Sequence, residues 1–213
     1  MKTAIVQPYF APHLAYFQLI NEVDNFVFYD DVNFIKRGWI NRNYITINGN
    51  IQRFTIPLKK VSQNKKINEV EVDWEGRSMN KLIKTISQNL KDSQGMCIFQ
   101  KIIESKPETI SETCILSIKL ACEYLGINTN LKKSSELNFN KHDDKILNLV
   151  EICRLQNSSH YINPENGKHI YDKKTFLKHG IKLNFINGCS SQSILEVITS
   201  VKNHNQLKNY TLV

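Results

Sequence analysis

The chain opens with an apolar run, a loop held by two prolines and an amphipathic run, and this order most constrains its fold. Ala4–Val6 is the apolar run, and Tyr16–Ile20 has the spacing of a helix. Pro8 and Pro12 fix their own φ angles and favour extended backbone in the residues before them. Phe26–Tyr29 is a second apolar run. Strand, helix and strand within about thirty residues predict a right-handed βαβ unit with parallel strands.

Polar and aromatic side chains follow the first predicted strand. Gln7, Tyr9 and His13 lie in the loop at its carboxyl end, where α/β sheets usually bind ligands. The alternative is an ordinary strand–turn–helix joint with aromatic core residues. Asp30 and Asp31 end the second strand at the same edge, where a carboxylate can orient a ribose hydroxyl, a metal or an ammonium group. An Asx turn explains Asp30 equally well, whereas for Asp31 we favour a functional role, as a general base.

A basic segment comes directly after Asp31. Arginine offers a planar fork that suits phosphate or carboxylate, and asparagine can donate and accept hydrogen bonds. The tryptophan of this segment either stacks on a base or covers the core. We therefore expect these residues to bind an anionic substrate. They are Lys36, Arg37, Trp39, Asn41, Arg42 and Asn43.

The middle of the chain predicts a β-hairpin and several helices. Asn48-Gly49 is a strong turn signal between the alternating runs Tyr44–Ile47 and Ile51–Pro57. Residues 67–72 alternate like another short strand, and Leu131–Asn140 reads as a polar connection. Helical spacing covers residues 77–90, 111–125 and 143–153.

The last third adds a second candidate loop. Ser159–Ile162 is a predicted strand, and the Asn/Pro/Gly loop after it contains Asn163 and Gly167. We expect this loop, the 7–13 loop, Asp31 and the basic segment to converge on one cleft. A helix over 172–178, a final strand over 181–185, a closing helix over 193–198 and a loosely tethered tail complete the chain.

These patterns predict an α/β fold with a mainly parallel sheet and flanking helices. The hairpin lies near 44–57, and a helical insertion lies near 76–155 of a single domain spanning residues 1–213. No apolar run approaches the length needed to span a bilayer, so we expect no membrane insertion.

The cysteines and the net charge limit the functional classes to which the chain can belong. An odd set of five cysteines without a C-x-x-C pair favours reduced, mostly buried thiols in a cytoplasmic protein over disulfides or a zinc site, and we expect no metal. They are Cys97, Cys114, Cys122, Cys153 and Cys189. The net charge of +8 suits an anionic small molecule such as a nucleotide sugar. Direct DNA binding is disfavoured because no nucleic-acid motif accompanies the charge, while a tRNA partner and a homo-oligomer stay open.

Several short motifs occur together in the order of one known family. They are Gln7-Pro8-Tyr9, Pro12, Tyr16-Phe17, Asp30-Asp31-Val32, Lys36, Trp39, Asn41-Arg42, Tyr161-Ile162, Gly167 and Tyr171. From residue 1 to about 198 the chain resembles the WbqC-like protein family. The resemblance implies a bacterial cytoplasmic protein from O-antigen or lipopolysaccharide gene clusters, suggested to transfer glycine or another aminoacyl group to sugars, and it adds Tyr171 to the candidate binding residues. The chain departs from the family pattern at His13, at Ala15 and in the short segment Gly188–Ser191.

The loop Pro12–Tyr16 resembles, more weakly, the HxGH-type loop of nucleotidyltransferases. Only His13 matches, since Tyr16 stands where the second histidine belongs. That resemblance implies an imidazole set against nucleotide phosphates at a helix start. It keeps open an ATP-using, adenylate-forming or nucleotidyltransferase-like enzyme as an alternative.

Our leading hypothesis is an N-acyl, aminoacyl or glycyl transferase that acts on a nucleotide-linked amino sugar. Asp31 or His13 would serve as general base, and the cations would neutralise phosphate. Gln7, Asn41 and Asn43 would orient the substrate. The acyl donor would be an ATP-derived adenylate, a coenzyme A thioester or an aminoacyl-tRNA. A non-catalytic nucleotide-sugar or partner-binding protein is the alternative from another class.

Overall fold

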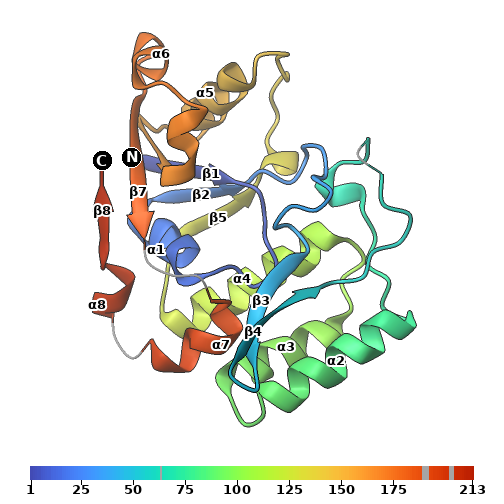
Figure 1. Cartoon of the computed structure of the whole chain (residues 1–213). Helices are drawn as coiled ribbons and strands as arrows, with labels where there is room; N and C mark the ends of the chain where they lie inside the picture. The colour runs from blue at the N-terminus through green and yellow to red at the C-terminus, as the bar shows by residue number, and fades with distance from the viewer. Residues whose placement is uncertain (63, 189–191, 202–203) are drawn as a thin grey trace.

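A computed structural model of the chain describes residues 1–62, 64–188, 192–201 and 204–213. Its main sheet has six strands in the order β5-β2-β1-β6-β7-β8 (Figure 1). Every neighbouring pair in this sheet is parallel except β7 with β8. The strands are β1 (Lys2–Val6), β2 (Asn25–Phe28), β5 (Asn130–Lys133), β6 (His160–Pro164), β7 (Lys182–Gly188) and β8 (Tyr210–Leu212). The predicted α/β fold with a mainly parallel sheet is confirmed.

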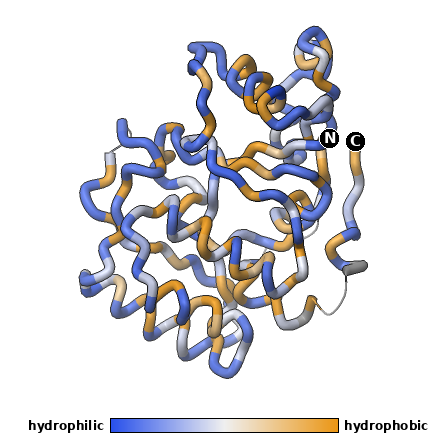
Figure 2. Tube along the Cα trace, turned by 180° about the vertical axis from the view of Figure 1, so that it is seen from behind, coloured by the Kyte–Doolittle hydropathy of each residue, from blue (hydrophilic) through white to orange (hydrophobic). Residues whose placement is uncertain are grey.

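Helices cover both faces of the sheet (Figure 1). The α-helices are α1 (Leu14–Glu22), α2 (Arg77–Asn89), α3 (Gln94–Ser105), α4 (Ile110–Leu125), α5 (Lys145–Leu155), α6 (Lys173–Lys178), α7 (Ile194–Val197) and α8 (His204–Leu207). Short 3-10 helices are η1 (Ile67–Glu69), η2 (Ser134–Glu136), η3 (Glu165–His169) and η4 (Ile198–Ser200). Hydrophobic and hydrophilic positions alternate along the outer helices, as expected for helices with one buried face (Figure 2).

Two hydrophobic clusters lie on opposite faces of the sheet. In β2, Phe26 and Phe28 belong to the cluster that contains α1 and α4, whereas Val27 belongs to the cluster that contains α5 and α6. Ala4 and Ile5 of β1 divide in the same way. Because successive side chains of a strand point to opposite faces, a strand buried on both sides is apolar throughout.

The connections change face between β1 and β6. The helix after β1, α1, packs in the first cluster, and the helix after β6, α6, packs in the second. Strands β1 and β6 are neighbours and parallel. This arrangement is the topological switch point at which doubly wound sheets form a crevice beyond the strand ends.

The predicted hairpin is confirmed as a separate two-stranded sheet. It consists of β3 (Arg42–Ile47) and β4 (Asn50–Thr55). Asn48 and Gly49 have φ angles of 50° and 76°, as a type I′ turn requires. The backbone N–H of Thr46 donates to Glu196 Oε2 at 3.1 Å, which ties the hairpin to α7.

Two strand assignments differ from the prediction. Within the expected polar connection over 131–140, β5 pairs in parallel with β2. It is an edge strand whose side chains are exposed or half-buried, so it needs no apolar alternation. The strand predicted over 67–72 is wrong, because Ile67–Glu69 is η1 and only isolated bridges, such as Leu58 with Val72, follow it.

The end of the chain and one helix also differ. β8 pairs with β7, for example through Ile186 and Leu212. The prediction of a loosely tethered tail is therefore wrong for residues 210–212, and β7 is not the final strand. α3 was not predicted, and it contains Gly95 near its start. A Cβ on Gly95 would lie 1.7 Å from the carbonyl oxygen of Leu195, so glycine lets α7 approach α3.

We predict that Gly95→Ala lowers the melting temperature by several degrees. Helix propensity alone favours alanine by about 1 kcal/mol, but here the methyl group would push α7 away from α3. Lys101→Ala, on the exposed face of the same helix, is the control and should change stability by less than about 0.5 kcal/mol. A Gly95→Ala protein as stable as the wild type would contradict this packing.

Candidate functional site

Buried side chains hold the backbone of the loop between β1 and α1. The N–H of Ala11 donates to Ser117 Oγ at 3.0 Å, and Ser193 Oγ donates to the carbonyl oxygen of Ala11 at 2.9 Å. Asn43 Nδ2 donates to the carbonyl oxygens of Phe10 and Ala11. Ala11 has a φ of 44°, a left-handed conformation that costs energy for a residue with a side chain. These bonds satisfy buried backbone groups and fix that conformation.

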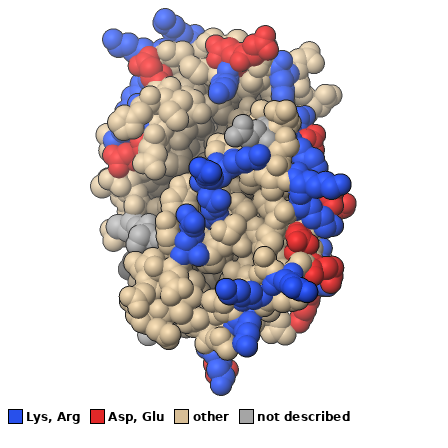
Figure 3. Space-filling view, turned by 45° about the vertical axis from the view of Figure 1, so that its right-hand side comes forward, with Lys and Arg blue, Asp and Glu red and all other residues tan. Residues whose placement is uncertain are grey.

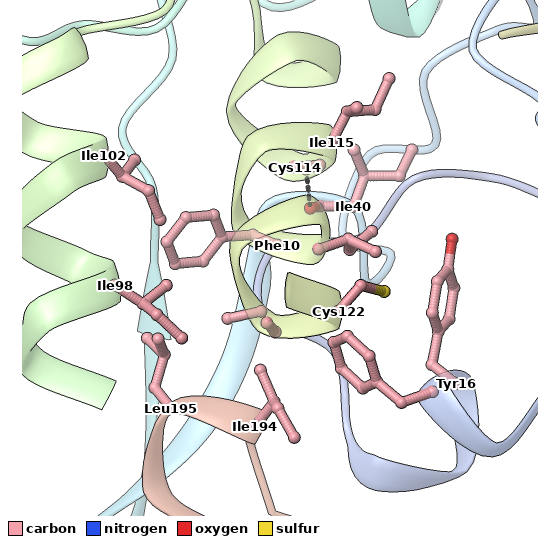
Figure 4. Close-up of a cluster of buried hydrophobic side chains, with 14 of the residues drawn as sticks. Phe10, Tyr16, Ile40, Ile98, Ile102, Cys114, Ile115, Cys122, Ile194 and Leu195 are labelled. Atoms are coloured by element: carbon pink, nitrogen blue, oxygen red, sulfur yellow. Dashed lines mark hydrogen bonds between the residues drawn. The ribbon is translucent and has the colours of Figure 1, made fainter. Parts of the chain in front are cut away.

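Apolar packing holds the same loop from the other side. The ring of Phe10 lies against Ile98 and Ile102 of α3, with α7 beside it (Figure 4). The N–H of Phe10 donates to the carbonyl oxygen of Ile40 at 2.9 Å, and the thiol of Cys114 donates to the same oxygen at 3.2 Å (Figure 4). The loop is therefore preorganised by the core.

The two amide residues of the basic segment bind protein backbone. Asn41 Nδ2 donates to the carbonyl oxygen of Ile56 at 2.8 Å, and Asn43 binds the 7–13 loop. Both side chains are buried. The structure thus gives Asn41 and Asn43 a positioning role, which joins the hairpin to the loop.

At the switch point, the 7–13 loop follows β1 and a second loop follows its neighbour β6, and we call the space expected between these two loops the crevice. The hydroxyl of Tyr16 donates to the carbonyl oxygen of Gln7 at 3.0 Å. Asn163, only 8% exposed, donates through Nδ2 to the Tyr161 hydroxyl at 2.6 Å. A Cβ on Gly167 would lie 2.6 Å from Asn163 Oδ1. Glycine at this position therefore leaves room for the Asn163 amide in the orientation that binds Tyr161.

Three tyrosines from three loops influence one another at this edge. Burial raises the pKa of Tyr9, and Tyr171 raises it further. Burial also raises the pKa of Tyr29 to about 12, with smaller contributions from Asp31 and Tyr171. The phenols are neutral at pH 7 and can donate hydrogen bonds. The structure thus brings together Tyr9, Asp31 and Tyr171, and it adds Tyr29, whose position between an apolar run and two aspartates was the available sequence signal.

The two aspartates have different partners. Asp30 is buried and accepts hydrogen bonds from the Ser135 N–H at 3.0 Å and the Ser135 hydroxyl at 2.8 Å, which joins β2 to η2. Asp31 accepts a hydrogen bond from Ser134 and forms an ion pair with Lys141. Sequence reasoning missed these partners, and the short Ser-Ser-Glu turn was the only signal. Because Asp31 is already paired, it is poorly placed to act as a free base.

His13 is the residue before the first turn of α1, and its side chain is exposed. Its ring has no hydrogen-bond or charge partner within the described part of the chain. Neighbouring protein atoms partly desolvate the ring, and because desolvation disfavours the charged form, it lowers the pKa of His13. The imidazole is therefore unprotonated at pH 7 and able to accept a proton.

The cations of the basic segment lie on the surface. Lys36, Arg37 and Trp39 are exposed, and Figure 3 shows Lys and Arg side chains across this face, beside a hollow. No hydrogen bond, ion pair or ring contact of the described residues joins these three to the tyrosines of the crevice. Arg42 is half-buried, and its Nε is shielded from solvent without a hydrogen-bond partner. Arg42 begins β3 and directly precedes Asn43, the residue that binds the 7–13 loop.

The described cysteines are free thiols. Cys97 is exposed, while Cys114, Cys122 and Cys153 are buried, and Cys189 lies outside the described residues. Burial raises the pKa of Cys122 and of Cys153 to about 12, so neither forms a thiolate nucleophile. The described part of the chain contains no group of three or more His, Cys, Asp or Glu able to hold a metal ion.

Comparison with known proteins assigns the family. The WbqC-like protein family matches residues 7–192. The chain belongs to the WbqC-like family. It is also 27% identical over 195 residues to an uncharacterized protein of Mycobacterium tuberculosis, covering 87% of this chain and 82% of that protein. No solved structure matches this WbqC-like chain. Among its described residues, no helix has the length and apolar character needed to cross a membrane.

We predict that Gly167→Ala breaks the bond between Asn163 and Tyr161. The new methyl group would displace the Asn163 amide, and we expect a loss of about 1 kcal/mol or more in the free energy of unfolding in urea. In an Asn163→Ala background, Gly167→Ala should lower the free energy of unfolding clearly less, because the amide that the new methyl group displaces is absent. Equal costs in both backgrounds would contradict this account of the loop.

Proposed function

We propose that this WbqC-like protein transfers an acyl group, in particular an aminoacyl group, to the amine of a nucleotide-linked amino sugar. The reaction would serve surface-polysaccharide synthesis in the bacterial cytoplasm. The single observation that carries the proposal is His13, an unprotonated and unpartnered imidazole on a preorganised loop at the carboxyl edge of the sheet. Membership of the family is consistent with this reaction.

His13 is the general base of the proposed reaction. The amine nitrogen of the sugar attacks the acyl carbonyl carbon, and its proton passes to the His13 imidazole. A C–N bond forms as the bond between the acyl carbon and the oxygen or sulfur of the activated donor breaks. The leaving group takes the bonding electrons, and the imidazolium can return the proton to it. The ion pair with Lys141 makes Asp31 the weaker candidate for this step.

The crevice supplies the binding groups for the acceptor. Neutral Tyr9, Tyr29 and Tyr171 offer ring faces and hydroxyls of the kind that bind sugars. Gln7 adds hydrogen-bonding groups at the end of β1, and Asn163 positions the Tyr161 hydroxyl beneath the second loop. Arg42, with Lys36 and Arg37 on the preceding loop, supplies positive charge for the diphosphate of a nucleotide sugar.

The unpartnered Nε of Arg42 leads to a prediction on ligand affinity. Arg42→Lys keeps the charge but loses the planar fork, so affinity for a nucleotide-linked amino sugar should fall by about one to two orders of magnitude. Arg77→Lys, an exposed arginine at the start of α2, is the control and should leave affinity unchanged. If Arg42 instead paired only within the protein, Arg42→Ala would lower the melting temperature of the ligand-free protein, and any loss of affinity would result from that loss of stability.

The test of the proposed function is the dependence of turnover on His13 and on pH. A base must be unprotonated, so the rate should rise as pH increases through the lowered pKa of His13, which lies below the 6.5 of an ordinary histidine. His13→Gln should lower kcat by about 10²–10⁴-fold and remove this acidic limb. His142→Gln, another exposed histidine, should change neither.

Two results would contradict the proposal. One is an acidic limb that persists in His13→Gln with the same rate. The other is saturable binding of the nucleotide sugar without acyl transfer from an adenylate, a thioester or an aminoacyl-tRNA, which would indicate a binding protein instead.

A further inference from the structure

The net positive charge of the chain comes from one segment. Residues 32–66 contain eight lysines and arginines and no aspartate or glutamate. The whole chain has 28 basic and 20 acidic residues, so the rest holds twenty of each and is neutral. The eight are Lys36, Arg37, Arg42, Arg53, Lys59, Lys60, Lys65 and Lys66, and with Trp39 and Tyr44 they form what we call the basic face.

The fold keeps this segment together in space. Its two ends run side by side, because Asn33 forms a β-bridge with Lys66 and the Phe34 N–H donates to the carbonyl oxygen of Lys65 at 2.9 Å. Between these ends lie the exposed loop with Lys36 and the β3–β4 hairpin. Figure 3 shows Lys and Arg side chains extending across this side of the molecule.

Carboxylates of the protein do little to neutralise the basic face. Within the described residues, Lys59 is its single member with an ion pair, formed with Glu71 at 3.3 Å. Glu69 accepts a hydrogen bond from the backbone N–H of Lys66, and Glu196 accepts one from the backbone of Thr46. Among the described residues, seven of these eight cations therefore have no carboxylate partner, and the excess positive charge of the segment favours a ligand with many negative charges.

Aromatic rings lie among these cations. Trp39 is 54% exposed, and its ring centroid is 5.7 Å from that of Tyr44. Tyr44 is opposite Arg53 in the hairpin, and Asn43 and Ile45, which alternate with it, are buried. Tyr44 and Arg53 thus share the outward face. Aromatic rings and guanidinium planes on an exposed strand surface are the groups on which unpaired bases stack.

We propose that the basic face binds a folded RNA, with phosphates on the cations and an unpaired base on Trp39 and Tyr44. The proposal deepens the proposed function, on which it rests for the identity of the RNA: the acyl donor is an aminoacyl-tRNA. A membrane surface fits less well, because bilayers take up a continuous apolar patch, whereas cations lie between exposed Ile35, Trp39 and Ile51 in the sequence.

The experiment measures binding of deacylated bacterial tRNA by fluorescence polarisation over a range of salt concentrations. One triple variant carries Arg53→Gln, Lys60→Gln and Lys66→Gln. The matched control carries Lys81→Gln, Lys84→Gln and Lys91→Gln, which removes the same charge from exposed positions on and after α2. None of these six residues belongs to the crevice.

We expect the first triple variant to bind tRNA at least tenfold more weakly at about 0.1 M salt and the slope of log affinity against log salt to flatten by about two. The control should stay within twofold of the wild type. Trp39→Leu should weaken binding about tenfold with little change in slope, since it removes stacking and no charge. Melting temperatures equal to that of the wild type establish that each variant is folded.

Equal weakening in both triple variants would overturn the proposal, because it would indicate attraction by net charge alone. Tighter binding to vesicles of phosphatidylglycerol and phosphatidylcholine than to tRNA would overturn it in favour of a membrane surface. Acyl transfer from a thioester without any tRNA binding would contradict the RNA-binding proposal but would support the proposed transferase function. Conversely, tRNA binding without transfer from any donor would contradict the proposed function and leave the RNA-binding face.

Discussion

The hydrogen bonds to Ala11 are the constraint on which the rest of the structure depends. A non-glycine residue in a left-handed conformation persists only where its surroundings hold it. Here Asn43 of the hairpin, Ser117 of α4 and Ser193 before α7 all bind this one stretch of backbone. Three segments far apart in the sequence are thereby fixed to the loop at the carboxyl end of β1. The course of the 7–13 loop, which ends at His13 before α1, follows from that junction.

Local patterns predicted the elements that are decided locally. The βαβ unit followed from apolar runs and two prolines, and the hairpin followed from Asn48 and Gly49, because their backbone preferences fit only a tight turn. Edge strands were missed: β5 and β8 gain their pairing from β2 and β7 and need no apolar alternation of their own. α3 was missed because it contains Gly95 near its start. The sequence does not reveal that the close contact with α7 is the reason for a glycine there.

The candidate site was predictable to the extent that it follows from strand order. Tyr9, Asp31 and Tyr171 come together because parallel strands end at one edge. The partner of Asp31 could not be found, since Lys141 lies 110 residues further along the chain. Nor could sequence distinguish an asparagine that binds substrate from one that binds backbone, as Asn41 and Asn43 do. Those roles depend on which loop packs against the residue.

The most direct test of the account is a crystal structure with a nucleotide-linked amino sugar. The account predicts the sugar between the loops after β1 and β6, with its amine facing His13 and its diphosphate at the Arg42 guanidinium. A sugar bound away from this edge, such as beside α6 and the chain's C-terminus, with the crevice filled by protein side chains, would contradict it.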